Sequence, residues 1–473
     1  MLLDPDVLAS VVSAHRTLPL DLLEVYAERT ATSAMVLKDG RIVDVTSGRE
    51  SGAGIRMRRG RSLVYSHTGD IAASAVLAAA RAAACLAAQL PPDDAPPLRA
   101  NLAAGPPDAE PGGGEDALPE AAVVPTERER QADLISSVPD LVEDGRDIVS
   151  LSAVLRTDHR VREIANSRGE RAAGDGARER LAVTVVLGSR TSPAGGRASI
   201  GVNAPDARLT EHDVREAVRE AVRRARARTD VVPAPTGEVP VVLAAGTGAV
   251  LIHEALGHGL EADHLPRRSS VFHDLLGRRI GPPDLHIVDD GSVPGAWGSA
   301  HFDDEGHRAG RTPLVEAGVL VGFLWDLAHA PAGRDVRPVN GRRQNYQCPP
   351  LPRMTNTLVL PGTVGPDDIV ADTPKGVYVA RLGSGRVNTA TGDFVFAAKE
   401  SYAIRDGRLR EPLADCSLVG NGLEVLREID AIGTDFTLGP PGNCGKDGQT
   451  LPVGYGQPTL RVRRGLTLGG TAA

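Results

Sequence analysis

A short apolar run in the middle of the chain carries two histidines and a glutamate within six residues. His253, Glu254 and His258 lie in the sequence LIHEALGH at residues 251–258. Histidine is the commonest protein ligand for a transition metal, and a glutamate beside a metal-activated water can take its proton. The run therefore predicts a hydrolytic metal site.

The spacing of the two histidines differs from that of the familiar zinc peptidases. Those enzymes carry histidines four residues apart on one helix face, whereas His253 and His258 lie five apart. Five residues of regular α-helix rotate by roughly 140°, which would separate the imidazoles. A π-bulge would return them to one face, and Gly257 would tolerate that distortion or a break in the helix. The pattern is HExxxH.

The third metal ligand has two candidates. Catalytic zinc usually has three protein ligands and one open position, so the two histidines need one more. Glu261, three residues after His258, is the first candidate. Cys444 is the second because it lies in the polar, glycine-rich segment PGNCGKDGQ, whereas Cys85 lies among apolar residues. The residues alone leave both open, and they also allow a plain structural pair of histidines.

Length and composition predict a multidomain globular protein. The chain has 473 residues, of which 41% are hydrophobic and 24% charged, so two or three domains are expected. A net charge of −8 and only 3% aromatic residues disfavour nucleic-acid binding. An acidic N-terminus argues against a secretory signal, and four scattered cysteines favour a reducing cytoplasm. The apolar stretch 74–90 is broken by Arg81, so no membrane span is predicted.

Composition divides the chain into four regions. Residues 1–90 predict an N-terminal α+β domain, and residues 91–125, rich in proline, glycine and acidic residues, predict a linker or surface loop. Residues 126–235 predict a central α+β region that ends in a charged, solvated helix. Residues 236–473 are strand-rich, with one major helix that carries His253. The first region contains short strand-like segments, at 22–28, 34–38, 41–46, 54–58 and 61–66.

The last third contains four polar runs, most of them with glycine. They lie at residues 298–306, 341–346, 352–357 and 383–389. Each predicts either an ordered, capped loop or part of a cleft rim that fixes a peptide backbone. The acids Asp303, Asp304 and Glu305 lack the spaced oxygen ligands of a Ca²⁺-binding loop.

Several of these segments, in this order, resemble the TldD/PmbA family of metallopeptidases. They are HEALGHGLEAD at 253–263, DDEG at 303–306, RMTNT at 353–357, VNTATGDF at 387–394 and CGKDGQ at 444–449. The resemblance is strong from about residue 239 onward and weaker over residues 22–90, while residues 91–125 have no counterpart. The intact HExxxH pattern is similar to the TldD side, which is the catalytic half.

The resemblance implies a zinc ion held by His253, His258 and Cys444, with Glu254 as the general base. It implies an α+β fold, in which an α/β N-terminal region precedes a β-rich C-terminal metallopeptidase domain. The expected activity is cleavage of unfolded or small peptides, including modified precursors, in the cytoplasm. The expected partner is a homologous TldE (PmbA) subunit that lacks the metal motif, and a homodimer is the alternative assembly.

The expected mechanism combines zinc with Glu254, which takes the water proton and passes it to the leaving amine. Candidates for stabilising the oxyanion are His301, Arg353 and Asn388. An extended peptide would add to an exposed sheet edge, which gives little sequence preference. The rival interpretation is a non-catalytic zinc-containing binding or regulatory protein, in which Glu261 fills the fourth metal position.

Overall fold

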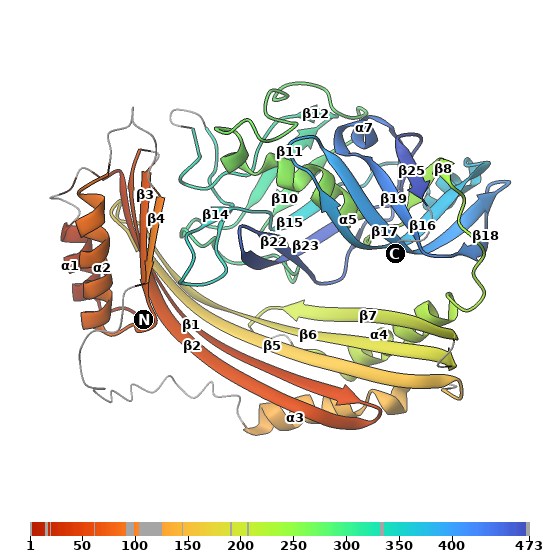
Figure 1. The fold of residues 1–473 in the computed structure, drawn as a ribbon, viewed down its shortest axis with the longest axis horizontal. Coiled ribbons are helices and arrows are strands. Elements are labelled where there is room, and N and C mark those ends of the chain that lie inside the picture. The colour runs from red at the N-terminus through yellow and green to blue at the C-terminus, as the bar shows by residue number, and fades with distance from the viewer. Residues whose placement is uncertain are drawn as a thin grey trace.

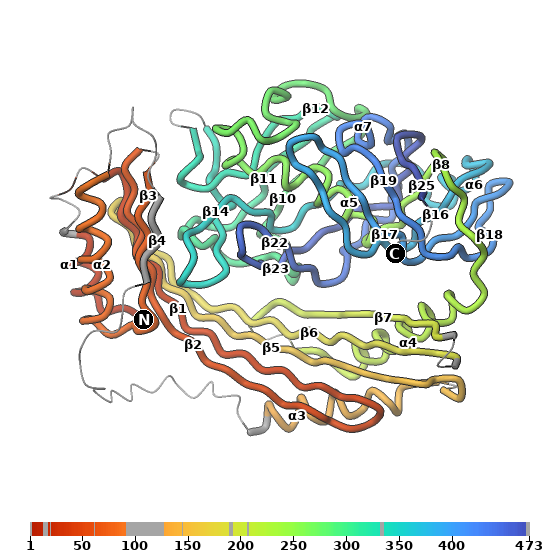
Figure 2. Tube along the Cα trace, viewed as in Figure 1, coloured from red at the N-terminus to blue at the C-terminus, as the bar shows by residue number. Residues whose placement is uncertain are grey.

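The computed structural model describes residues 2–14, 18, 20–60, 62–90, 99–103, 125–143, 145–189, 192–205, 208–331 and 335–469. The fold is α+β and rich in strands, as the sequence predicted. A long curved sheet from the N-terminal half lies along one side of a β-rich C-terminal body, residues 236–469 (Figures 1 and 2). Among the described residues, no helix is both long and apolar enough to span a membrane.

The N-terminal sheet has seven strands, and all neighbours are antiparallel except β3 and β4. In spatial order they are β4 (Arg99–Ala103), β3 (Ser62–Thr68), β2 (Arg41–Arg59), β1 (Leu22–Lys38), β5 (Ile148–Asn166), β6 (Arg171–Ser189) and β7 (Ser192–Asn203). Because β1 pairs with β5, the regions 1–90 and 126–235 that we expect as separate units share one sheet.

The two faces of this sheet have different chemistry because successive side chains of a strand point to opposite faces. One face carries apolar residues such as Val25, Leu155 and Leu181, which pack under helices. These helices are α1 (Pro5–Ala14), α2 (Ala73–Ala87), α3 (Pro125–Ser136) and α4 (Glu211–Arg226). The alternate positions carry charged and aromatic residues, and this second, concave face lies toward the C-terminal body (Figure 1).

Two sequence-based expectations differ from the observed strands. The short segments at 22–28 and 34–38 are parts of one continuous strand, β1, because the residues between them, rich in threonine, keep pairing with β2 and β5. β2 likewise runs through the gap between 46 and 54. Within the expected linker 91–125, Arg99–Ala103 form β4 beside β3, while 91–98 and 104–124 lie outside the described residues.

The C-terminal body contains two large sheets. The first runs β20 (Ile429–Ile432), β24 (Leu460–Val462), β9 (Val241–Leu243), β16 (Lys375–Val387), β17 (Asp393–Arg405), β19 (Cys416–Asn421), β25 (Leu466–Gly469) and β8 (Gly237–Glu238), with β18 (Arg408–Leu413) beside β17. The second runs β12 (Val319–Leu320), β11 (Arg311–Glu316), β10 (Ile287–Asp290), β15 (Asn356–Val359), β23 (Gln449–Gln457) and β21 (Thr437–Leu438), with β22 (Gly442–Lys446) beside β23. A small pair is formed by β13 (Gly341–Arg342) and β14 (Leu351–Pro352), and two short helices are α6 (Pro366–Ala371) and α7 (Gly422–Arg427).

The helix α5 (Ala249–Ile252) lies in the core shared by these two sheets. Its buried residues Leu251 and Ile252 belong to one apolar cluster with Val379 of β16 and Val453 of β23. Burial of this apolar surface fixes the helix against both sheets. The chain that follows α5 is therefore held at a defined position between them.

A network of ion pairs joins the concave face of the N-terminal sheet to the C-terminal body; we call it the junction network. Arg56 donates to Glu24 and to Glu305, in each case at 2.6 Å. Arg343, fully buried, donates to the same Glu24 and lies over the Tyr26 ring at 4.2 Å. Each of these arginines and glutamates therefore contacts a partner of opposite charge, as buried ionisable groups generally require.

Candidate metal centre

The helix α5 continues into a π-helical turn, His253–Gly257, and then a 3₁₀ turn, His258–Leu260. The π turn accommodates one more residue than an α-helical turn, and so brings side chains five apart onto one face. The His253 and His258 ring centroids are 5.5 Å apart. The distortion that the HExxxH spacing requires is therefore present.

Gly257 is required for a different reason from the one we expected. Its φ of −56° is ordinary helical backbone, which any residue can adopt. A Cβ at this position would lie 1.9 Å from the Met354 sulfur, so only glycine lets the π turn pack this closely. The constraint is the packing beneath the turn and not the backbone conformation.

Cys444 reaches the histidines from β22, and its Sγ lies 3.2 Å from Nε2 of His258. His253, His258 and Cys444 are all buried, and their ligand atoms lie within 4.8 Å of one another. Two imidazoles and one thiolate form a donor set that zinc accepts, and three protein ligands leave a fourth position open. These three side chains therefore fit the expected metal.

Glu261, the other candidate ligand, lies behind the histidine. Its carboxylate contacts Nδ1 of His258 at 3.1 Å, the ring nitrogen opposite the one that faces Cys444. Lys446 lies 3.1 Å from the same carboxylate and Arg353 lies 3.4 Å from it. Glu261 thus orients the His258 ring through a hydrogen bond, as carboxylates behind metal-binding histidines commonly do.

The electrostatics of these groups favour a thiolate and a carboxylate. Burial alone would raise the pKa of the Cys444 thiol, but the His253 and His258 imidazoles lower that pKa to about 4. Burial would also raise the pKa of Glu261, but the charges of His258, Lys446 and Arg353 lower it to about 2. Both side chains are therefore anionic at neutral pH, which is the state that supports a bound cation.

Glu254 lies on the open side of the centre. Its Oε2 is 3.6 Å from Nε2 of His258, and its side chain is 24% exposed, in contrast to the buried ligands. It lines a cavity of about 410 Å³, which we call the metal cavity. His253 and Tyr455 also line this cavity, and their ring centroids are 6.5 Å apart. A carboxylate between the donor set and a cavity is placed to exchange protons with a bound water or substrate.

The metal cavity contains residues that the sequence did not single out. Its far wall carries Arg180, Arg197 and Arg224, and Arg381 and Tyr455 line it from the C-terminal body. Burial raises the pKa of Tyr455 to about 12, so its hydroxyl remains protonated. The alternation of charged and apolar residues in β6 could have placed Arg180 on the concave face, but not beside the histidines. Of the polar runs, the one at 383–389 contributes its first three residues to this cavity.

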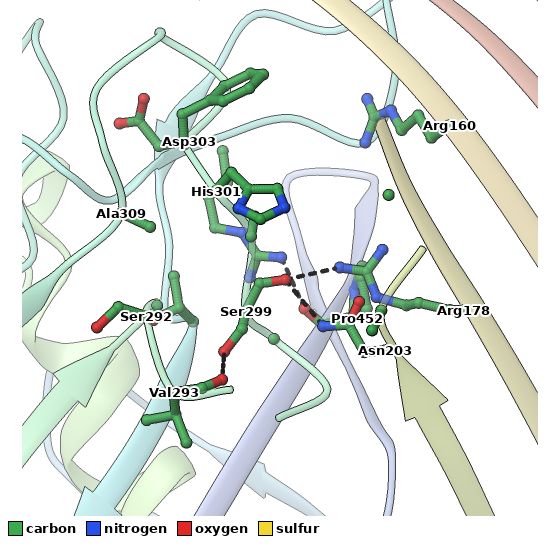
Figure 3. Close-up of a pocket in the computed structure, with 18 of the residues that line it drawn as sticks. Arg160, Arg178, Asn203, Ser292, Val293, Ser299, His301, Asp303, Ala309 and Pro452 are labelled. Carbon is green, nitrogen blue, oxygen red and sulfur yellow. Dashed lines mark hydrogen bonds between the residues drawn. The ribbon is translucent and has the colours of Figure 1, made fainter. Parts of the chain in front are cut away.

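None of the three expected oxyanion donors lines the metal cavity. His301 lines a second cavity, of about 300 Å³. Figure 3 shows Arg178 and Asn203, which also line it, hydrogen-bonded to the Ser299 carbonyl. Arg353 is fully buried and donates to the Cys444 carbonyl at 2.8 Å, so it supports β22. Asn388 accepts backbone N–H groups of a turn at 390–391. Sequence spacing could not distinguish these local roles from a role in the site.

A second group of candidate ligands, Asp303, Glu305 and His307, also has ligand atoms within 4.8 Å of one another. Both carboxylate oxygens of Glu305 are already used, one by Arg56 at 2.6 Å and one by the backbone N–H of Leu327 at 2.7 Å. The group adjoins the junction network. Burial raises the pKa of Glu305 to about 8 although the charge of Arg56 lowers it, and the charges of Asp326 and Asp303 add to the rise.

Comparison with protein families gives two matches along the chain. The model of the PmbA/TldA metallopeptidase C-terminal domain matches residues 236–470, and the model of the PmbA/TldA metallopeptidase domain 1 matches residues 23–87. The first match contains all the residues of the donor set together with Glu254.

Individual relatives agree with these matches. A metalloprotease TldD homolog of Haemophilus influenzae is 40% identical over 56% of this chain, and the chain spans only about half (55%) of that relative's length. A metalloprotease of Methanothermobacter thermautotrophicus is 31% identical over 100% of both chains. The solved structure of TldE from Thermococcus kodakarensis matches with a TM-score of 0.73 over 98% of this chain and 100% of that one. It is 19% identical, which establishes a shared fold alone.

Proposed function

The chain belongs to the TldD/PmbA family of metallopeptidases, and we propose from this premise that it is a zinc-dependent peptidase. His253, His258 and Cys444 hold the zinc ion, and Glu254 is the general base. The observation that carries the proposal is the meeting of His253, His258 and Cys444, whose ligand atoms lie within 4.8 Å of one another. His253 and Glu254 connect this group to the metal cavity, which they line.

Zinc bound by this donor set supplies Lewis-acid activation of water and of the scissile carbonyl. Glu254 takes the water proton and delivers it to the leaving amine, since it is the carboxylate that faces both the donor set and the cavity. Tyr455 lines the same cavity. We assign its protonated hydroxyl as the hydrogen-bond donor that stabilises the oxyanion. Glu261 holds the His258 ring in place from behind.

The geometry favours catalysis over the structural-zinc alternative. A structural site would need a fourth protein ligand, and Glu261 was the obvious one. Glu261 instead contacts the ring nitrogen of His258 that faces away from Cys444. Among the described residues, the group of mutually close ligand atoms at this place contains three members, which supports a site with three protein ligands and a fourth position for water or substrate.

We assign unfolded or small peptides, including modified precursors, as the substrates. A cavity of about 410 Å³ accommodates a few residues of an extended chain and excludes a folded domain. The edge strand β7 lies beside the cavity through residues 197–199, so an extended peptide can pair with it along its backbone. We place this activity in the cytoplasm.

The partner that we propose is a TldE-type subunit, with a homodimer as the alternative. The support is the shared fold with the solved TldE structure over nearly the whole chain. A subunit that resembles this one but lacks HExxxH would enclose the cavity without adding a second centre.

The decisive experiment compares Glu254→Gln with Cys444→Ala, each assayed for zinc content and for cleavage of an unfolded polypeptide, with and without a TldE-type subunit. We expect Glu254→Gln to retain stoichiometric zinc and to lose activity by roughly 10²- to 10⁴-fold, because it removes the proton acceptor alone. Cys444→Ala should lose both zinc and activity. Glu216→Gln, on the exposed face of α4, is the matched control.

Full activity of Glu254→Gln would exclude Glu254 as the base. Stoichiometric zinc in Cys444→Ala would exclude Cys444 as a ligand. If Glu254→Gln retained zinc and also the cellular role of the protein, the binding-protein alternative would replace the peptidase.

A further inference from the structure

The metal cavity has an unusual charge composition for the site of a peptidase. Four arginines line it, namely Arg180 of β6, Arg197 of β7, Arg224 of α4 and Arg381 of β16. Among the described residues that line it, Glu254 is the one carboxylate. A bound zinc ion would add further positive charge. The cavity therefore carries an excess of positive charge next to the proposed catalytic base.

Three of the four arginines lack a counterion. Arg224 pairs with Glu220 at 2.7 Å, but Arg180, Arg197 and Arg381 form no ion pair with any residue that the structure describes. The one side-chain partner of Arg180 is the neutral Ser199 hydroxyl, at 3.5 Å. The Nε atoms of Arg180 and Arg381 are buried without a hydrogen-bond partner. These guanidinium groups have donor capacity that the protein itself does not use.

Such an arrangement is unfavourable in the absence of an anion. Burial, followed by the charge of Arg197, lowers the pKa of Arg180, and burial, followed by the charge of Arg224, lowers the pKa of Arg381. Both directions mean that the surroundings disfavour the charged form. Partly buried cations without partners cost free energy, and a cavity with low-dielectric walls concentrates their field on a ligand.

The positions of these arginines require the assembled tertiary structure. Arg180 lies on the concave face of the N-terminal sheet because it alternates with Leu181, which is buried on the helix side. Arg381 comes from the C-terminal body, where it is paired in register with Glu400 across β16 and β17. Glu400 forms its ion pair with Arg223, at 2.7 Å, and its charge acts on Arg381 without an ion pair between the two. The N-terminal wall thus supplies Arg180 and Arg197, and the C-terminal wall supplies Arg381.

We propose that the metal cavity selects peptides that carry a carboxylate close to the cleaved bond, and that Arg180 and Arg381 bind this carboxylate, with Arg197 adding to the field. The inference rests on the proposed peptidase function and adds its substrate class. Guanidinium groups bind carboxylates through paired N–H donors, which gives orientation as well as affinity. The carboxylate has two sources in a peptide, the free C-terminus or an Asp or Glu side chain, and both present the same chemistry.

The test measures the binding and cleavage of four matched fluorescent peptides. Two differ only in a C-terminal carboxylate or amide, and two amidated ones differ only in a central Glu or Gln. Dissociation constants are measured on the full-length, zinc-loaded Glu254→Gln protein, and KM and kcat on the wild type. Arg180→Gln, Arg381→Gln and their combination are introduced into both. Arg219→Gln, on an exposed face of α4 outside the cavity, changes the net charge as much as either single substitution does.

We expect the protein to bind the acidic member of at least one pair roughly 10- to 100-fold more tightly, as charged hydrogen bonds allow. The ratio should fall toward 1 in the double arginine variant and stay unchanged in Arg219→Gln. A ratio that depends on the terminal pair identifies the C-terminus as the source, and one that depends on the Glu/Gln pair identifies the side chain. The effect should lie in KM more than in kcat, and should weaken as ionic strength rises.

The inference would be overturned if the protein bound both members of both pairs equally, or if the preference survived in the double variant. Continued peptide cleavage in either case would leave the proposed peptidase function standing. The salt dependence of the wild type requires no substitution, so it tests the proposal even if a variant fails to fold. Preference for the acidic peptides without any cleavage by the wild type would instead overturn the peptidase function and leave the carboxylate site standing.

Discussion

Two groups of arginines lie where the concave face of the N-terminal sheet meets the C-terminal body, and they differ in their partners. In the junction network, Arg56 and Arg343 converge on Glu24, and Arg162 donates to Asp304. In the metal cavity, Arg180 and Arg381 form no ion pair with any of the described residues, and the charges of Glu400 and Asp415 act on Arg381 only from a distance. Arginines thus join the N-terminal sheet to the C-terminal body in one region and are available to bind a ligand in the other. Pairing, and not residue type, separates the two roles.

The difference has a physical basis in desolvation. Arg343 is fully buried, and an arginine without water must be neutralised by the protein. Arg180 and Arg381 are only partly buried and Arg197 is exposed, so water can solvate them until a ligand replaces it. A paired arginine should therefore matter for stability, whereas an unpaired one should matter for substrate binding.

The largest expected effect is a loss of stability when a paired arginine of the junction network is replaced. Arg343→Met removes one partner of a buried pair and leaves Glu24 with Arg56 alone, so we expect a loss of roughly 3–5 kcal/mol in the free energy of unfolding. Arg381→Met, the matched change in the cavity, should cost less than about 1 kcal/mol because no ion pair is lost. Denaturant unfolding of both variants measures the difference. Equal losses would show that pairing does not separate the two regions.

An intermediate effect concerns the pH dependence of the junction network. Burial would raise the pKa of Asp304, but Arg162 and then Arg160 hold it well below its usual range. A lowered carboxyl pKa gives stability that is present above the unfolded-state pKa, roughly 4, and lost as pH falls through the folded-state pKa. Asp304→Asn should therefore cost roughly 2–3 kcal/mol at neutral pH, and this cost should shrink below about pH 4. Unfolding curves from pH 7 to pH 3 test the trend, and a pH-independent difference would contradict it.

The smallest expected effect is a change in zinc affinity when Glu261, which pairs with the cations behind the donor set, is replaced. The cations behind the donor set, Lys446 and Arg353, are neutralised by Glu261, unlike the arginines in front. Glu261→Gln keeps a polar partner for His258 but removes that charge, so zinc affinity should fall by roughly 10- to 100-fold. Competition with a chromophoric chelator measures the change. Unaltered affinity would mean that Glu261 serves only to balance Lys446.

Much of the metal centre could be anticipated because its signals are local. The HExxxH spacing required a distorted helix, and the π turn at His253–Gly257 provides it. The charged helix expected at the end of the central region is observed as α4, where a capping box at Thr210 and Asp213 marks its start. The expected oxyanion donors failed because hydrogen-bonding side chains in glycine-rich runs look alike, whether they cap a turn, as Asn388 does, or support a strand, as Arg353 does.

The sequence by itself determined the residue types and their local periodicity: two histidines and a glutamate in an apolar helix, and charged side chains that alternate with apolar ones along β6. Only the tertiary structure decided which distant groups meet them. Cys444 lies 186 residues from His258 yet within 3.2 Å of it, and Arg180 and Arg381 share a cavity although they come from different sheets. Periodicity fixes the face on which a side chain lies, but the packing of sheets around one core fixes what lies opposite that face.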